Sequence, residues 1–202
     1  MLVMKPTYNN KIAPFAFDEV ASKIVPANVY IKVSVIDVLS IKEKDLVYVL
    51  KFRMYMSWYD YRLKYHNLKE SLSLNSLSLN EVVNLWIPFI LFSNTEKSEF
   101  TEGDKESEMY ISREGDFKES SLDIVDEINI FEGSENQILF KHLYSKEFRC
   151  LYQLQLYPFD KQLCYMQALP KDSLGIFTSN YLTTKLTLKR EMSILQYTQY
   201  EN

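Results

Sequence analysis

The sequence predicts an all-β fold, an antiparallel β-sandwich. One observation behind this prediction is a set of long runs in which every second residue is apolar. A period of two places the apolar side chains on one face of a strand, whereas a helix would scatter them around its circumference. Size is the second observation, because 202 residues with 47% hydrophobic side chains suffice for one large all-β domain or two small ones.

The clearest strand is predicted from Leu46 to Trp58. Apolar residues occupy every second position of this run, while Lys51, Arg53 and Tyr55 lie on the opposite face. Such a strand spans roughly 43 Å at about 3.3 Å per residue. That length is typical of a tall sandwich rather than a compact barrel.

Other elements are predicted on both sides of this strand. A short helix is expected at Phe17–Ile24, and no internal repeat is visible. Six further strands are expected from apolar alternation and turn residues: Val29–Leu39, Gln137–Tyr144, Phe148–Leu156, Gln162–Leu169, Tyr181–Leu188 and Ser193–Thr198.

The segment 95–136 differs from the rest of the chain in charge. Between Glu96 and Glu135, fourteen Asp or Glu and four Lys or Arg give a net −10, whereas the whole chain carries −4. The remainder therefore carries +6. We interpret this acidic insert as a solvated loop. The alternative is a flap that gathers cations or a cationic ligand by long-range attraction.

Composition argues against several classes of protein. The net charge is negative and basic residues do not cluster with aromatic ones, so no nucleic-acid partner is expected. There is no Gly-rich phosphate loop and no motif that pairs carboxylates, so the chain is not expected to be an enzyme or to bind a cofactor. His66 and His142 lack the nearby companions of a zinc site, so no metal is expected.

No targeting or membrane-spanning segment is visible. The opening Met1–Lys5 is not followed by an apolar run of useful length, and no stretch approaches the ~20 apolar residues of a membrane helix. We therefore expect the chain to be a fragment if the protein is secreted or membrane-bound.

The two cysteines of the chain, Cys150 and Cys164, enclose a turn. From the residues alone they could be two buried thiols, a pair of metal ligands or a disulfide. Pro158 ends the strand that follows Cys150, because proline cannot donate to a β-ladder. Asp160 can accept local backbone N–H bonds and fix the turn before the chain returns to Cys164.

The stretch CLYQLQLYPFDKQLC resembles the signature loop of the Cys-loop receptors, the pentameric neurotransmitter-gated ion channels. Tyr157, Pro158, Asp160 and the spacing of the two cysteines match the family pattern, and Tyr152 departs from it. The resemblance implies a Cys150–Cys164 disulfide. Closing a ring of fifteen residues would contribute about 3 kcal/mol to stability.

Two more motifs occur in the order that this family has. Trp58-Tyr-Asp60-Tyr-Arg62-Leu63 looks like W-x-D-x-R-L. Trp86-Ile-Pro88, followed by Phe92 and Asn94, looks like W-x-P-D-x-x-F-x-N, with Phe89 at the Asp position. The resemblance implies that both tryptophans are mainly structural.

The resemblance implies a domain organisation. It covers nearly the whole chain, so residues 1–202 are expected to be the extracellular ligand-binding domain of a channel subunit at the plasma membrane. This domain is expected to be incomplete at its C-terminus, and the pore domain lies outside the chain. The implied partners are neighbouring identical or homologous subunits of a pentamer and a small-molecule ligand.

The resemblance also assigns residues to two tasks. The tip of the ring, Tyr157, Pro158, Phe159 and Asp160, would contact the pore domain and couple ligand binding to opening. Ligands of the family bind between subunits, and the matching positions here are Arg53, Tyr55, Phe92, Phe140 and Lys141. Arg53 would suit a carboxylate, which a guanidinium binds bidentately. Arg53 and Tyr55 could equally be ordinary polar-face residues.

Two other functions remain open at this stage. A soluble pentameric binding protein without a pore, similar to the acetylcholine-binding proteins of molluscs, would share the motifs. An adhesion or lectin-like β-sandwich is the third reading. Downstream coding sequence with four apolar runs of ~20 residues would identify a channel.

Overall fold

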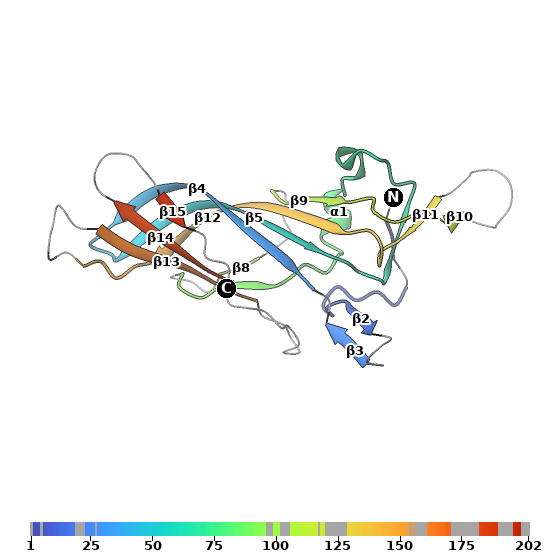
Figure 1. The fold of residues 1–202 in the computed structure, drawn as a ribbon, viewed down its shortest axis with the longest axis horizontal. Helices are drawn as coiled ribbons and strands as arrows, with labels where there is room; N and C mark the ends of the chain where they lie inside the picture. Colours follow the sequence, from blue (N-terminus) through green and yellow to red (C-terminus); the bar gives the residue numbers. More distant parts are fainter. Residues whose placement is uncertain are drawn as a thin grey trace.

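The fold is seen in a computed structural model that describes residues 2–4, 6–18, 23–26, 28–95, 99–101, 106–116, 118–119, 129–153, 155, 161–170, 182–189 and 196–198. These residues are mostly β-strand, with one 3-10 helix, Leu72–Asn75, and one short α-helix, α1 (Leu79–Val82). The sandwich is elongated, and the long strands follow its long axis (Figure 1). The predicted antiparallel β-sandwich is confirmed.

Two antiparallel sheets form the body of the molecule. The first contains, in spatial order, β4 (Tyr30–Lys42), β5 (Val47–Trp58), β12 (Ile138–Arg149) and β9 (Glu108–Ile111). The second contains β15 (Gln196–Thr198), β14 (Leu182–Lys189), β13 (Lys161–Pro170), β7 (Ile90–Phe92) and β8 (Glu99–Phe100).

Two smaller sheets lie towards the end that holds the N-terminus (Figure 1). One has the order β1 (Leu2–Met4), β6 (Leu63–His66), β11 (Asn129–Glu132) and β10 (Lys118–Glu119). The other is a hairpin of β2 (Phe15–Asp18) and β3 (Lys23–Pro26).

The helix predicted at Phe17–Ile24 is wrong, because this hairpin occupies its place. Phe15 pairs with Pro26 and Asp18 pairs with Lys23. Eight residues are too few for a helix that is stable by itself. The β-branched pair Ile24-Val25 also favours a strand, so strand pairing prevails over a weak local helix preference.

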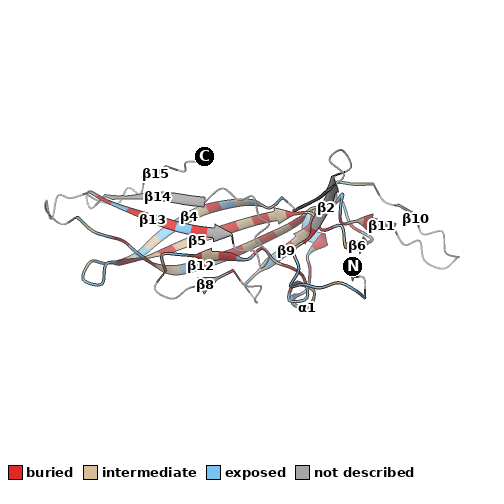
Figure 2. Ribbon diagram, turned by 90° about the horizontal axis from the view of Figure 1, so that it is seen from below, coloured by how far each residue is buried: buried red, intermediate tan, exposed pale blue. Residues whose placement is uncertain are grey.

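The core is built on the alternation of β5. From Tyr48 to Trp58 every second side chain is buried, and the intervening ones are half-buried, as Figure 2 shows by alternating colours along the strand. Phe92 of the second sheet contacts this core, with its ring 5.7 Å from that of Phe52 and 5.5 Å from that of Tyr144. These contacts hold the two sheets together.

β12 is one strand where the sequence predicts two, Gln137–Tyr144 and Phe148–Leu156. It pairs with β5 along its whole length, from Ile138 opposite Trp58 to Arg149 opposite Val47. Because β5 begins at Val47, strand pairing with it ends at Arg149. The chain therefore leaves the sheet at Cys150.

Part of the acidic insert belongs to the folded body. β9 pairs with β12, and β11 pairs with β6. Met109, Ile111 and Phe131 are buried. These strands correct the interpretation of the whole insert as a solvated loop.

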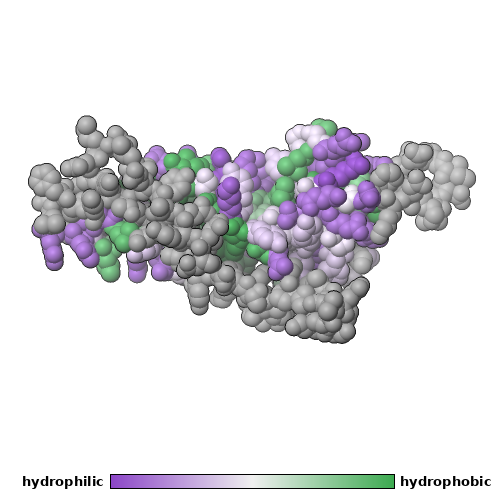
Figure 3. Space-filling view, in the orientation of Figure 1, coloured by the Kyte–Doolittle hydropathy of each residue, from purple (hydrophilic) through white to green (hydrophobic). Residues whose placement is uncertain are grey.

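Among the residues that the structure describes, no helix is long and apolar enough to span a membrane. The visible face of the molecule mixes hydrophilic and apolar residues (Figure 3). Within the same described ranges, no three His, Cys, Asp or Glu side chains gather in a way that could hold a metal ion.

Candidate functional site

Three predicted ligand contacts share one face of the first sheet. Arg53 and Tyr55 lie on β5 with their side chains pointing away from the core, and both are half-buried. Lys141 of β12 pairs directly with Tyr55. On the other side of Tyr55, its partner in β4 is Lys32. The strand register therefore brings one aromatic and three basic side chains together.

A groove of about 520 Å³ lies over this face. Its walls combine aromatic, aliphatic and basic side chains, and Arg53 lies two residues along β5 from its lining. Such a mainly apolar hollow with a few polar groups is typical of small-molecule sites. The side chains used in the argument below are Tyr30, Lys32, Tyr55, Tyr110 and Lys141.

One carboxylate, Glu108 of β9, is bound to this basic face. Lys141 Nζ lies 2.7 Å from Glu108 Oε2, and the Tyr110 hydroxyl donates to the same oxygen at 3.0 Å. The Lys141 hydrogen bond is the main cause that lowers the pKa of Glu108 below 4.5, with smaller contributions from Tyr110 and from the charge of Arg53. The groups on this face therefore already bind one carboxylate, that of Glu108 in the same chain.

The structure does not place Phe92 and Phe140 on this face. Both rings belong to the core, with 0% and 1% exposure. Phe140 borders the groove, but its ring points to the side of the sheet opposite Lys141, because neighbouring residues of a strand alternate between faces. The sequence already indicated this, because Phe140 and Lys141 are adjacent in a predicted strand and so must face opposite sides of the sheet.

The W-x-D-x-R-L motif forms a buried ion pair at the opposite end of the sandwich from the disulfide. Asp60 is fully buried, and Arg62 binds it through Nε–H to Oδ1 at 2.8 Å and Nη2–H to Oδ2 at 2.6 Å. Arg62 Nη1 also donates to the carbonyl of Ile12 at 2.7 Å. We call Tyr8, Trp58, Asp60, Arg62 and Trp86 the Asp60 cluster.

The remaining members of the Asp60 cluster join three parts of the chain. The Tyr8 hydroxyl donates to Asp60 at 3.4 Å and accepts the Trp86 backbone N–H at 2.9 Å. Burial raises the pKa of Tyr8 to about 12, so this hydroxyl remains a donor. Trp58 and Trp86 pack edge to face, with ring centroids 5.7 Å apart. The predicted structural role of both tryptophans agrees with this packing.

Three further hydrogen bonds involve Pro88 and Gly133. The carbonyl of Pro88, the third residue of its motif, accepts the Thr101 hydroxyl at 2.6 Å. Gly133 N–H donates to Leu63 at 3.0 Å, and the Gly133 carbonyl accepts from Asp60 N–H at 3.2 Å. A Cβ at Gly133 would collide with the Asp60 carbonyl, so glycine is required there.

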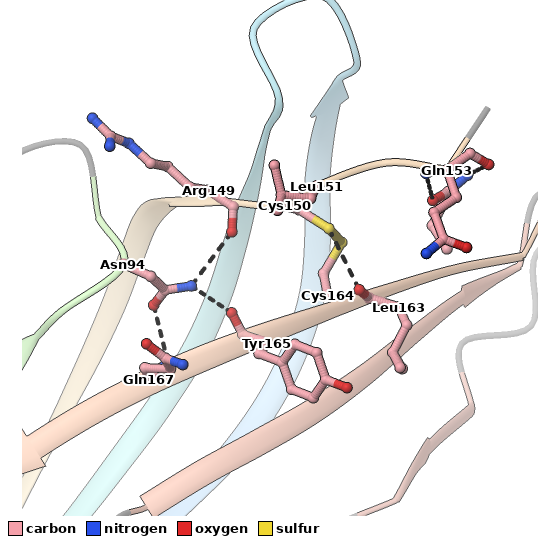
Figure 4. A pocket seen from close by; sticks show the side chains of 10 residues that line it. Asn94, Arg149, Cys150, Leu151, Gln153, Leu163, Cys164, Tyr165 and Gln167 are labelled. Atoms are coloured by element: carbon pink, nitrogen blue, oxygen red, sulfur yellow. Dashed lines mark hydrogen bonds between the residues drawn. A yellow bond between two sulfur atoms is a disulfide. The ribbon is translucent and has the colours of Figure 1, made fainter.

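The predicted Cys150–Cys164 disulfide is present, with a Cα–Cα distance of 5.3 Å (Figure 4). The start of the ring contacts the turn between β4 and β5. Cys150 N–H donates to the Leu46 carbonyl at 2.8 Å, and the Tyr152 hydroxyl donates to the Val47 carbonyl at 2.9 Å. Tyr152, the departure from the family pattern, thus bonds the ring to this turn.

Leu46 itself has a φ of 56°, which is unusual for a residue with a side chain. The sequence predicts it as the first residue of the strand, but it lies in the turn and is 43% exposed. This backbone conformation points the Leu46 carbonyl towards the Cys150 N–H, which donates a hydrogen bond to it.

A second link between the two arms of the ring, made by hydrogen bonds, was not predicted from the sequence. Gln153 N–H donates to Gln162 Oε1 at 2.8 Å, and Gln162 Nε2 donates back to the Gln153 carbonyl at 2.9 Å. Gln162 is 9% exposed. Its side chain therefore acts as a bridge between the two arms of the ring. The predicted tip, Tyr157, Pro158, Phe159 and Asp160, lies outside the described residues.

Comparison with known proteins adds an independent finding. The model of a family described as neurotransmitter-gated ion-channel ligand binding domain matches residues 2–172. One relative is the gamma-aminobutyric acid receptor subunit epsilon of Rattus norvegicus, 32% identical over 92 residues, which are 46% of this chain. Another is the glutamate-gated chloride channel of Drosophila melanogaster, 27% identical over 142 residues, or 70% of this chain. The matches cover 16% and 26% of these relatives' lengths.

Proposed function

Since this chain belongs to the family of neurotransmitter-gated ion-channel ligand-binding domains, we propose that it binds a small molecule with a carboxylate between neighbouring subunits. The family is one of ligand-gated channels and not of enzymes. The observation that carries the proposal is the basic face of the first sheet, where Tyr55 and Lys141 line a groove of about 520 Å³ and Arg53 lies two residues along β5 from that lining.

The chemistry of this face favours an amino acid. Arg53 offers a guanidinium, which binds carboxylates through paired hydrogen bonds. Glu108 and the rings of Tyr55 and Tyr110 suit an ammonium group at the other end of the ligand. The two relatives above are named for gamma-aminobutyric acid and glutamate, which carry both groups, and this supports the proposal.

A neighbouring subunit supplies the second wall of the site. The groove is open to the surface, so one chain covers only part of a ligand. The edge strand β4 exposes Ile36, Leu39 and Ile41 at 44%, 49% and 47%, and exposed apolar rows are typical of protein contacts. We therefore assign the chain to a pentamer of identical or homologous subunits at the extracellular face of the plasma membrane.

The ring couples this site to a pore domain. The bonds from Cys150 to Leu46 and from Tyr152 to Val47 join the ring to the β4–β5 turn, so the two move as one unit. Tyr157, Pro158, Phe159 and Asp160 form the contact with the pore domain. The alternative, a soluble pentameric binding protein without a pore, predicts a coding sequence without four downstream apolar runs of ~20 residues.

The test is Arg53→Ala in the complete subunit, with Lys51→Ala as the control. Lys51 lies on the same face of β5, but it is four residues along the strand from the groove lining at Tyr55, whereas Arg53 is two residues from it. Arg53→Ala should weaken the response to an amino-acid agonist by about tenfold or more, equivalent to ~1.4 kcal/mol, whereas Lys51→Ala should not. An unchanged concentration–response curve with normal surface expression would remove Arg53 from the site.

A further inference from the structure

Asn94 lies where the two main sheets meet at the ring. The residue follows β7, and Figure 4 shows its carboxamide between the strands that lead into and out of the disulfide. Its neighbour Thr95 bridges to Phe148 of β12, and Ser93 N–H donates to the Gln167 carbonyl of β13 at 3.1 Å. The short segment Ser93–Thr95 therefore contacts both sheets.

Both the nitrogen and the oxygen of the Asn94 carboxamide form hydrogen bonds. Nδ2 donates to the Tyr165 carbonyl at 2.6 Å and makes a longer contact of 3.4 Å with the Arg149 carbonyl. Oδ1 accepts the Gln167 N–H at 3.0 Å. The main chain adds a fourth bond, because Arg149 N–H donates to the Asn94 carbonyl at 2.8 Å.

Two of these bonds reach positions that flank the ring. Arg149 precedes Cys150, and Tyr165 follows Cys164. We propose that Asn94 is a positioning residue that joins the loop after β7 to both ends of the ring, so that a displacement of Leu91–Ser93 reaches both ends together. Its signalling consequence depends on the coupling role proposed above, but the mechanical link does not.

The chemistry of this link requires asparagine. A carboxamide offers two N–H donors and one acceptor on a short side chain. Aspartate keeps the acceptor for Gln167 but loses both donors, and its charge would face two carbonyl oxygens. Alanine loses all three side-chain bonds and keeps only the main-chain bond to Arg149. The two variants therefore separate the donor bonds from the acceptor bond.

The experiment compares Asn94→Asp and Asn94→Ala in the complete subunit, with Ser93→Ala as the control. The Ser93 hydroxyl donates to the exposed Gln167 side chain at 3.2 Å and makes no bond to the backbone of β12 or β13 in the part of the chain that the structure describes. Amide hydrogen exchange at Gln167 should rise by about tenfold in Asn94→Ala and stay near wild type in Asn94→Asp. Exchange at Cys150 should rise roughly threefold in both.

Function is measured on the same variants. Both should reduce the maximal agonist-evoked current by about threefold or more while ligand affinity stays within about twofold, and Ser93→Ala should change neither. Unchanged exchange at Cys150 in both variants would overturn the link. Faster exchange with normal current would overturn the positioning role. If the wild-type subunit gives no ligand-gated current, the proposed function fails, and exchange alone then decides whether the link exists.

Discussion

The two ends of the sandwich are held by different interactions. At one end, the Asp60 cluster buries a carboxylate under a bidentate guanidinium, with bond lengths of 2.6 and 2.8 Å. At the other end, a disulfide and neutral hydrogen bonds hold the ring, and Leu151 and Tyr165 beside it are 84% and 38% exposed. Both ends carry family motifs, and the disulfide itself is buried, but the residues that flank it face water while the Asp60 carboxylate is fully buried.

This difference separates a structural role from a movable one. Breaking a buried ion pair leaves a charge without a partner in a dry site, and the cost rises with burial. Neutral hydrogen bonds near the surface can exchange with water at a net cost of about 1 kcal/mol each. The Asp60 cluster is therefore expected to contribute more to the stability of the fold than the neutral hydrogen bonds at the described ends of the ring.

The largest predicted effect is the loss of Asp60. Asp60→Ala leaves Arg62, whose side chain is only 12% exposed, without its carboxylate, and should reduce the free energy of unfolding by about 3–5 kcal/mol. Chemical denaturation measures this change. The matched control is Glu132→Ala, which breaks the more exposed pair with Lys64 and should cost about 1 kcal/mol or less. Equal losses in the two variants would contradict the distinction.

The second effect is the loss of the disulfide. Replacing Cys150 and Cys164 together by serine should lower the free energy of unfolding by about 3 kcal/mol, because the unfolded chain gains the freedom of an open fifteen-residue loop. Unfolding of wild type with and without a reductant gives the same comparison. A loss much larger than that of Asp60→Ala would mean that the ring, and not the Asp60 cluster, fixes the fold.

The Gln162 bridge should contribute less. Gln162→Ala removes two hydrogen bonds to Gln153, with an expected cost of about 1–2 kcal/mol. Gln155→Ala is the control, because Gln155 is in the ring but exposed. Amide exchange at Gln153 should rise in the first variant only. Protection of Gln153 that survives without Gln162 would show that another group closes the ring.

The smallest effect concerns the groove between the two ends. Because Lys141 lowers the pKa of Glu108 from 4.5, the ionised pair stabilises the folded chain above pH 4.5. That stabilisation is lost as the pH falls through the lower folded-state pKa. Thermal unfolding of wild type and Glu108→Gln should therefore differ slightly at neutral pH and converge in acid. A difference that grows in acid would contradict the assignment.

Alternation and motifs in the sequence were sufficient for most of the fold. The inward row of β5 from Tyr48 to Trp58 and the disulfide were predictable, because period-two burial and the Cys-loop spacing are local features. The hairpin β2–β3 and the single strand β12 were not. The hairpin and the full length of β12 depend on which strand pairs with each segment. Strand pairing is set by tertiary structure and not by local residue preference.

The candidate site was predictable only in part. Arg53, Tyr55 and Lys141 meet as expected, because strand alternation places them on one face. Glu108 joins them through the pairing of β9 with β12, which brings together residues 33 positions apart. The bridges of Gln162 and Asn94 depend on side-chain amides that reach backbone groups in other segments, and a single sequence contains no signal for such contacts.

The most direct test of the central claim, that the ring end transmits and the other end supports, is Asp160→Asn in the complete subunit. Ligand affinity and maximal current are measured on the same cells. Asparagine keeps the size and an acceptor oxygen of Asp160 but removes the charge that would pair with the pore domain. The account predicts affinity within about twofold of wild type and a clearly reduced maximal current. Affinity and current both intact, or both lost together, would contradict it.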